Sequence, residues 1–117
     1  MTYRFSLLFL LITNIAMAQV DWKTDSEVQE LFKQEKRTVI KLHSADWCKH
    51  CKNVKAMLDK HADFINENWY AIFVDETNNK NSSVSLYPTT MLWTKSGTNI
   101  MIEGAFDKKL LTALKSQ

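Results

Sequence analysis

The chain of 117 residues has little cysteine, proline or glycine: it contains two cysteines, one proline and two glycines. Two cysteines are too few for the disulfide framework of a small secreted protein, which needs several bridges across wide separations. With so few prolines and glycines, each is expected to mark a specific turn of the backbone. The length predicts a single domain with a hydrophobic core of modest size.

A strong charge of either sign is also missing. The formal net charge is +2, charged residues make up 24% of the chain, and no run of lysine or arginine stands out. Proteins that bind nucleic acid or anionic membrane surfaces carry a concentrated basic patch, so neither kind of partner is expected.

The N-terminal residues have the three-part pattern of a secretory signal peptide. A single charge, Arg4, precedes the apolar run Leu7–Ile12, and an Ala-Met-Ala sequence ends at Ala18. The alternative, an uncleaved anchor, would need the roughly 20 apolar residues of a membrane-spanning helix. We therefore expect a signal peptide over residues 1–18, followed by a domain over residues 19–117 without stable membrane insertion. Its expected location is periplasmic or secreted, where disulfides form.

The rest of the chain predicts an α/β domain. Helical spacing of apolar residues indicates helices, and β-branched or continuous apolar runs indicate strands. We expect helices at 23–34, 48–65 and 106–115, strands at 37–44, 68–75, 89–94 and 98–104, and a loop at 76–85. A strand-helix-strand unit followed by a hairpin predicts a central mixed sheet of about four strands, with helices on both faces.

The same patterns assign side chains to the core or the surface. The first helix offers two alternative capping boxes, Thr24 with Glu27 or Ser26 with Gln29. His43 and His61 are expected at the surface. The side chains expected in the core are the helical stripe Cys51, Val54, Leu58, Ala62 and Ile65, together with Met57, Met91, Met101, Trp69 and Trp93.

The two cysteines stand two residues apart, at the start of the second predicted helix. A bridge across so short a loop stabilises a fold little, which makes a purely structural role a poor explanation. A helix N-terminus and nearby cations favour the thiolate, which is the nucleophile in disulfide exchange. The pattern predicts Cys48 as the attacking thiol, Cys51 as the resolving thiol, and Lys49 and His50 as the nearby cations.

Metal binding is an alternative use of the pair, with Cys48, Cys51, His50 and His43 as possible ligands. A closed zinc site needs four ligands, and the sequence has no second Cys-x-x-Cys and no histidine pair at ligand spacing. Covalent haem attachment needs a histidine after the second cysteine, where Lys52 stands. We therefore expect no metal. Copper or zinc binding and a redox-inert binding module stay as alternatives.

The motif ADWCKHCK after an apolar strand, a strand ending in FVD, the sequence YPTT, a hairpin and a final helix together resemble the thioredoxin-like family. The resemblance covers nearly all of the chain after the signal peptide. It implies a thioredoxin-like fold, thiol-disulfide oxidoreductase activity, a redox-active Cys48–Cys51 pair as the sole cofactor, and a cis Tyr87–Pro88 peptide bond. The implied substrate groove is lined by Trp47, Tyr87, Pro88 and Thr89. The implied partners are protein thiols and disulfides and a redox-recycling protein, with the chain itself a monomer.

Two departures from typical thioredoxins bear on the redox direction. Lys-His replaces Gly-Pro between the cysteines, and a histidine there resembles protein disulfide isomerases and periplasmic disulfide oxidases. That resemblance implies that His50 stabilises the Cys48 thiolate and makes the couple more oxidising. The sequence Ala-Asp-Trp before Cys48 instead resembles the thiol-exchanging domain of the transmembrane disulfide-interchange reductase, a reductant. Both directions stay open.

Other departures concern groups that are missing. The buried aspartate that typical thioredoxins carry six residues before the first cysteine is replaced by Leu42, and the lysine of the next strand by Ala71. The resolving thiol, Cys51, therefore lacks its usual acid–base helper. The leading strand of typical thioredoxins is expected to have no counterpart, and the helix they often place within 75–88 is expected to shrink to a turn.

Overall fold

The computed structural model describes residues 19–78, 86–106 and 108–115. The predicted signal peptide lies outside the described residues, as does most of the predicted 76–85 loop. Five strands form one mixed sheet in the order β1-β3-β2-β4-β5. Their bounds are β1 Trp22–Lys23, β2 Thr38–Ser44, β3 Trp69–Asp75, β4 Thr89–Trp93 and β5 Asn99–Glu103. The expected α/β class with a mixed sheet is confirmed, with one strand more than predicted.

The additional strand is β1, which pairs in parallel with β3 and brings Trp22 opposite Ala71. The expectation that the leading strand has no counterpart was therefore wrong. A two-residue strand is too short to show an alternating pattern, so the sequence carried no signal for it. The predicted parallel pair and hairpin are confirmed, since β2 is parallel to β3 and β4 is antiparallel to β5. Strand β4 is also antiparallel to β2, which makes β2 the central strand.

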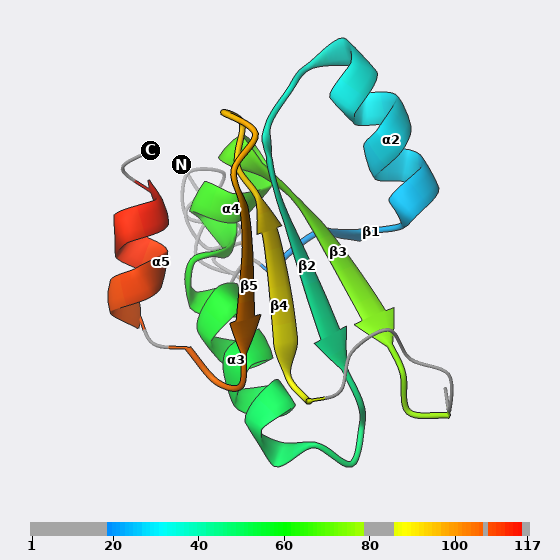
Figure 1. Cartoon of the computed structure of the whole chain (residues 1–117), viewed down its shortest axis with the longest axis vertical. Coiled ribbons are helices and arrows are strands. Elements are labelled where there is room, and N and C mark those ends of the chain that lie inside the picture. The colour runs from blue at the N-terminus through cyan, green and yellow to red at the C-terminus, as the bar shows by residue number, and fades with distance from the viewer. Residues whose placement is uncertain (1–18, 79–85, 107, 116–117) are drawn as a thin grey trace, which may run out of the picture.

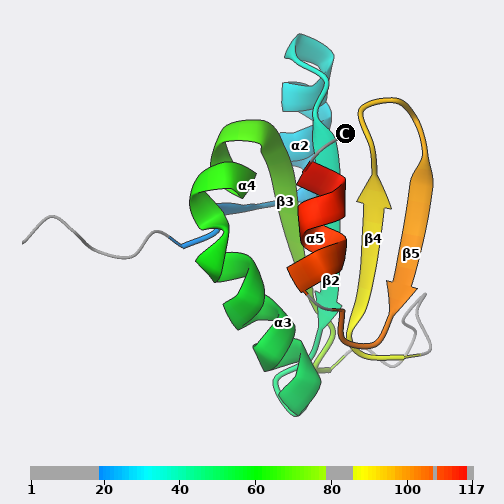
Figure 2. The same cartoon turned by 90° about the vertical axis from the view of Figure 1, so that its left-hand side faces the viewer.

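Helices cover both faces of the sheet, as Figures 1 and 2 show. The helix α2 packs on one face, and α3, α4 and α5 pack on the other. Their bounds are α2 Asp25–Gln34, α3 Lys49–Lys60, α4 Ala62–Asn68 and α5 Lys108–Lys115. Among the described residues, no helix is long and apolar enough to cross a membrane.

Local side-chain contacts explain where the helices begin and end. Thr24 and Glu27 form the capping box of α2, so the first of the two alternatives is correct. The single helix predicted over 48–65 is two helices, because the backbone of His61 is not helical (φ −111°, ψ 20°). Its N–H bonds to the carbonyl of Leu58, three residues back, which tightens and ends the last turn of α3.

Two apolar clusters fill the space between the sheet and the helices. The larger cluster joins Ile40 and Leu42 of β2 to α3, α4 and α5, and the predicted stripe from Val54 to Ile65 forms its centre. The smaller cluster joins Val39 of β2 to α2. The central strand β2 is therefore covered on both faces, and this rigid strand leads directly into the Cys-x-x-Cys motif.

Two surface and core assignments were wrong. His43, expected at the surface, is 4% exposed, because it lies on the central strand between β3 and β4. Met101, expected in the core, is 59% exposed. It lies on the edge strand β5, where its neighbours Ile100 and Ile102 pack into the larger cluster and the alternation of a strand turns Met101 to the opposite face.

Candidate active site

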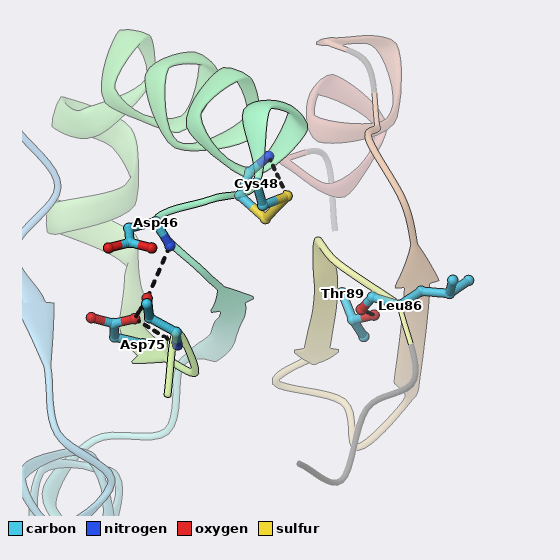
Figure 3. Close-up of a disulfide and its surroundings, with 7 residues drawn as sticks. Asp46, Cys48, Asp75, Leu86 and Thr89 are labelled. Atoms are coloured by element: carbon cyan, nitrogen blue, oxygen red, sulfur yellow. Dashed lines mark hydrogen bonds between the residues drawn. A yellow bond between two sulfur atoms is a disulfide. The ribbon is translucent and has the colours of Figure 1, made fainter. Parts of the chain in front are cut away.

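A disulfide joins Cys48 and Cys51 at the start of α3 (Figure 3). Cys48 is the N-cap residue, with an extended backbone (φ −97°, ψ 108°), and its Sγ accepts a hydrogen bond from the N–H of Cys51 at 3.2 Å. Cys48 is 7% exposed, whereas Cys51 has no exposed surface. A substrate can therefore approach Cys48 more readily than Cys51. The N–H group on its sulfur favours a negative charge there.

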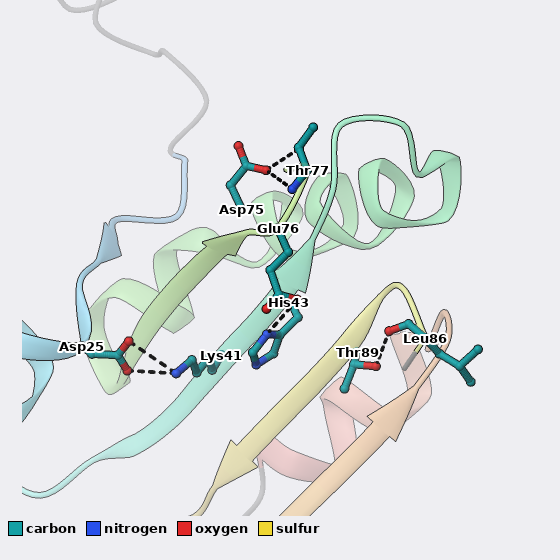
Figure 4. Close-up of polar contacts among 8 residues, drawn as sticks. All are labelled: Asp25, Lys41, His43, Asp75, Glu76, Thr77, Leu86 and Thr89. Atoms are coloured by element: carbon teal, nitrogen blue, oxygen red, sulfur yellow. Dashed lines mark hydrogen bonds and ion pairs between the residues drawn. The ribbon is translucent and has the colours of Figure 1, made fainter. Parts of the chain in front are cut away.

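The segment that precedes Cys48 is tied to the segment that follows β3. Glu76 N–H donates to the carbonyl of Ser44 at 2.8 Å, and Asp46 N–H donates to the hydroxyl oxygen of Thr77 at 2.9 Å. The Thr77 hydroxyl in turn donates to the carboxylate of Asp75, and Thr77 N–H donates to the same oxygen at 3.0 Å (Figures 3 and 4). These bonds lower the pKa of the Asp75 carboxyl, the hydroxyl bond most. Thr77 therefore connects the loop before Cys48 to the segment that follows β3.

The replacement Thr77→Val is expected to loosen the loop before Cys48, because valine cannot accept the bond from Asp46 or donate to Asp75. Hydrogen exchange of the Asp46 amide should become faster, and Thr77→Ser, which retains the hydroxyl, should behave like the wild type. The folded-state pKa of Asp75 lies below its ordinary value of 3.8, so its contribution to stability is present above pH 3.8. The part of the stability difference between the two variants that comes from the Asp75 carboxylate should disappear as the pH falls through the folded-state pKa, and the part from the Asp46 amide should remain. Equal amide exchange in both variants would contradict this role.

The segment before β4 packs against the cysteine pair. The Tyr87–Pro88 peptide bond is cis, as the resemblance implied. Tyr87 packs against the buried cluster of Ala45, Cys48 and Cys51, and its ring meets that of Trp47 edge-on at 5.5 Å between centroids. Trp47 is 64% exposed. The two rings therefore form an apolar surface next to Cys48.

Hydrogen bonds fix the same segment from its other side. The Thr89 hydroxyl donates to the carbonyl of Leu86 at 2.7 Å, and Gly104 N–H donates to the carbonyl of Pro88 at 2.7 Å. Pro88 and Thr89 are buried, and Leu86 is 51% exposed. Of the four groove residues implied by the resemblance, Trp47 and Tyr87 thus present side-chain surface, while Pro88 and Thr89 shape the backbone.

Beneath the disulfide, the positions that the resemblance singled out are apolar and buried. Leu42 has no exposed surface and Ala71 is 2% exposed. A cavity of about 200 Å³ reaches Cys51 from the side of β3. Its lining residues are Ser44, Ala45, Asp46, Cys51, Lys52, Lys55, Phe73 and Asp75. The sequence had not indicated this cavity, because α3 and β3 line it together with the loop before Cys48.

A buried polar pair lies near the end of β2. Nδ1 of His43 is 3.4 Å from Oε2 of Glu76, and both side chains are at most 5% exposed (Figure 4). In the described part of the chain, neither imidazole nitrogen has a partner in hydrogen-bond geometry. Sequence reasoning missed this pair, since Glu76 falls in a segment that reads as a polar loop. The one available signal was its place directly after the strand that neighbours β2.

The remaining predicted residues, Lys49 and His50, are exposed on the first turn of α3, beside Cys48 in the chain.

The described side chains were also compared with the arrangement that a bound metal ion requires. In the ranges that the structure describes, no group of three or more His, Cys, Asp or Glu side chains is arranged to hold a metal ion.

Comparisons with known proteins agree with this architecture. A protein-family model described as thioredoxin matches residues 19–116. Comparison with curated proteins gave no significant match. Among solved structures, chloroplastic thioredoxin z is similar at 17% identity and a TM-score of 0.68, over 87% of this chain and 96% of that one. Thioredoxin-2 of the malaria parasite is similar at 22% identity and a TM-score of 0.58, over 68% of this chain and 82% of that one. A redox protein from Chlamydomonas reinhardtii is similar at 17% identity and a TM-score of 0.64, over 88% of this chain and 36% of that one.

Proposed function

The chain belongs to the thioredoxin family, and on that premise we propose that it is a thiol-disulfide oxidoreductase acting on proteins in the cell envelope. The observation that carries the proposal is the disulfide at the N-cap of α3, in which Cys48 is slightly exposed and Cys51 has no exposed surface. A structural bridge has no need of that asymmetry, whereas disulfide exchange in two steps does.

In the oxidised protein, a substrate thiolate attacks Sγ of Cys48, because Cys51 is not accessible. The Cys48–Cys51 bond breaks, a mixed disulfide forms at Cys48, and Cys51 leaves as a thiolate that takes up a proton. A second substrate thiol then releases Cys48. In the reduced protein the steps run in reverse: Cys48 attacks a substrate disulfide and Cys51 resolves the mixed disulfide.

Two groups favour the thiolate of Cys48. The helix N-terminus contributes about 0.3–2 kcal/mol, and the Cys51 N–H already bonds to the sulfur. His50, on the first turn of α3, adds a positive charge when it is protonated. Since both stabilise the reduced form, they make the couple more oxidising.

The substrate binds as an extended segment along Tyr87, Pro88 and Thr89, with an apolar side chain against Trp47. The exposed ring of Trp47, its edge-on contact with Tyr87 and the neighbouring exposed Leu86 support this groove. The envelope location rests on the signal-peptide pattern of residues 1–18. A separate redox partner recycles the protein, which acts as a monomer without metal or organic cofactor.

The test is turnover of a defined protein disulfide, such as that of insulin, with dithiothreitol as the source of electrons. The wild-type protein should accelerate the reduction, and Cys48→Ser should react at the uncatalysed rate, because serine provides no thiolate. A wild-type protein that leaves the rate unchanged, although its own disulfide is reduced by dithiothreitol, would overturn the proposal.

A further inference from the structure

The proposed mechanism requires Cys51 to become a nucleophile inside the protein. Its side chain has no exposed surface, and burial in apolar surroundings disfavours a thiolate. Leu42, at the position of the family's buried acid, is also fully buried and carries no charge. Another group must therefore favour the thiolate of Cys51 when it attacks Cys48.

The cavity of about 200 Å³ is the place where a charge can act on Cys51. It is large enough for water, and charged side chains stand among its otherwise apolar lining, so water in it has polar partners. Its charged lining residues are Lys52 and Lys55 of α3, Asp46 of the preceding loop and Asp75 at the end of β3. The cavity also gives the proton of Cys51 a route to water.

Among these groups, Lys55 is the cation best positioned to act on Cys51. It follows Cys51 by four residues on α3, so the two side chains are neighbours on one side of the helix. Its Nζ lies 4.7 Å from the centre of the Phe73 ring, which also lines the cavity, and this contact holds the ammonium group at the cavity. Lys52 also lines the cavity, but its side chain points about 100° around the axis of α3 from that of Cys51.

The two carboxylates act in the opposite sense, since a negative charge disfavours a thiolate. The carboxylate of Asp75 accepts two hydrogen bonds from Thr77, which draw it toward the loop after β3. Figure 3 shows the carboxylates of Asp46 and Asp75 on the side of this loop, away from the disulfide. The charge that acts most directly on Cys51 is therefore that of Lys55.

We propose that the ammonium group of Lys55 stabilises the Cys51 thiolate during the second step of disulfide exchange, an inference that rests on the proposed function. In this step the Cys51 thiol gives its proton to water in the cavity, and its thiolate attacks Sγ of Cys48. The bond between Cys48 and the substrate sulfur breaks, and the substrate leaves as a thiolate that takes up a proton. The two electrons pass from the cysteine pair to the substrate. Lys55 acts through its charge and takes no part in the bond changes.

The variant Lys55→Met tests this role, because methionine retains an apolar side chain against Phe73 and lacks the charge. The reduced protein is mixed with oxidised glutathione, quenched with acid at intervals and analysed by mass spectrometry. This separates formation of the mixed disulfide at Cys48 from its resolution by Cys51. Formation should proceed at the wild-type rate. Resolution at pH 7 should slow about tenfold, and its pH profile should move to higher pH, as expected for loss of one nearby opposite charge.

Two further variants make the test specific to charge and place. Lys55→Arg should restore most of the resolution rate, since it keeps the charge. Lys60→Met removes a lysine that is exposed like Lys55 but lies at the far end of α3, and it should resolve at the wild-type rate. Unchanged resolution and an unchanged pH profile in Lys55→Met, or failure of Lys55→Arg to restore the rate, would overturn the role of Lys55. Absence of any mixed disulfide at Cys48 in Cys51→Ser, in which resolution is blocked, would instead overturn the proposed function.

Discussion

Replacing Cys51 by serine is expected to leave a substrate covalently attached to Cys48. The accessible Cys48 still attacks a substrate disulfide, but no internal thiol remains to resolve the product. Release then depends on an external thiol, and an internal thiol outpaces a millimolar external one by on the order of 10³-fold or more. The adduct with a peptide disulfide should therefore accumulate, and mass spectrometry of the intact protein should detect it.

The matched control is Cys48→Ser, in which only the buried Cys51 remains. This variant should form the adduct slowly or not at all, because Cys51 has no exposed surface. The result that contradicts the assignment is an adduct that forms as fast through Cys51 as through Cys48. The two thiols would then have exchanged their expected roles.

Breaking the buried pair of His43 and Glu76 is expected to have the largest effect on stability. Both side chains are at most 5% exposed, so removal of the Glu76 carboxylate leaves the His43 imidazole buried with no partner among the described residues. Glu76→Met should lower the free energy of unfolding by about 3 kcal/mol. That is a large fraction of the roughly 5–15 kcal/mol that stabilises a domain of this size. Urea unfolding followed by tryptophan fluorescence measures it.

The double variant His43→Leu with Glu76→Met makes this prediction specific. Replacing both partners with apolar side chains removes the unpaired group, so the double variant should lose clearly less stability than the sum of the single variants. A coupling of at least about 1 kcal/mol is expected for side chains in contact. Additive losses would show that the two residues contribute independently and that the contact does not stabilise the fold.

Most of the fold could be predicted, because each long element carries its own periodic pattern. The stripe from Cys51 to Ile65 indicated a buried helix face, and the apolar run of β3 indicated a strand covered on both faces. The break at His61 could not be predicted, because the apolar spacing continues unchanged across it into α4. The two-residue strand β1 depends on pairing with β3 and has no local signal.

The centre of the candidate site could be predicted for a different reason. Cys48, Cys51 and Pro88 belong to short motifs, and the chain holds no other cysteine or proline with which they could be confused. Thr77, Lys55 and the pair of His43 with Glu76 depend on which loops and faces meet in space. The register of β2 with β3, which sets Ser44 opposite Asp75, determines those contacts. No motif in the sequence records that register.

The reduction potential of the Cys48–Cys51 couple tests the central claim most directly. The protein is equilibrated with glutathione buffers of increasing ratio, and the reduced fraction is measured after acid quenching and alkylation. If the Cys48–Cys51 couple takes part in disulfide exchange, its reduction potential is predicted to lie between about −270 and −120 mV. A value near the lower end indicates a reductant, and a value near the upper end indicates an oxidant tuned by His50. A potential below about −300 mV, with the bridge oxidised in every glutathione buffer, would identify a structural disulfide and contradict the account.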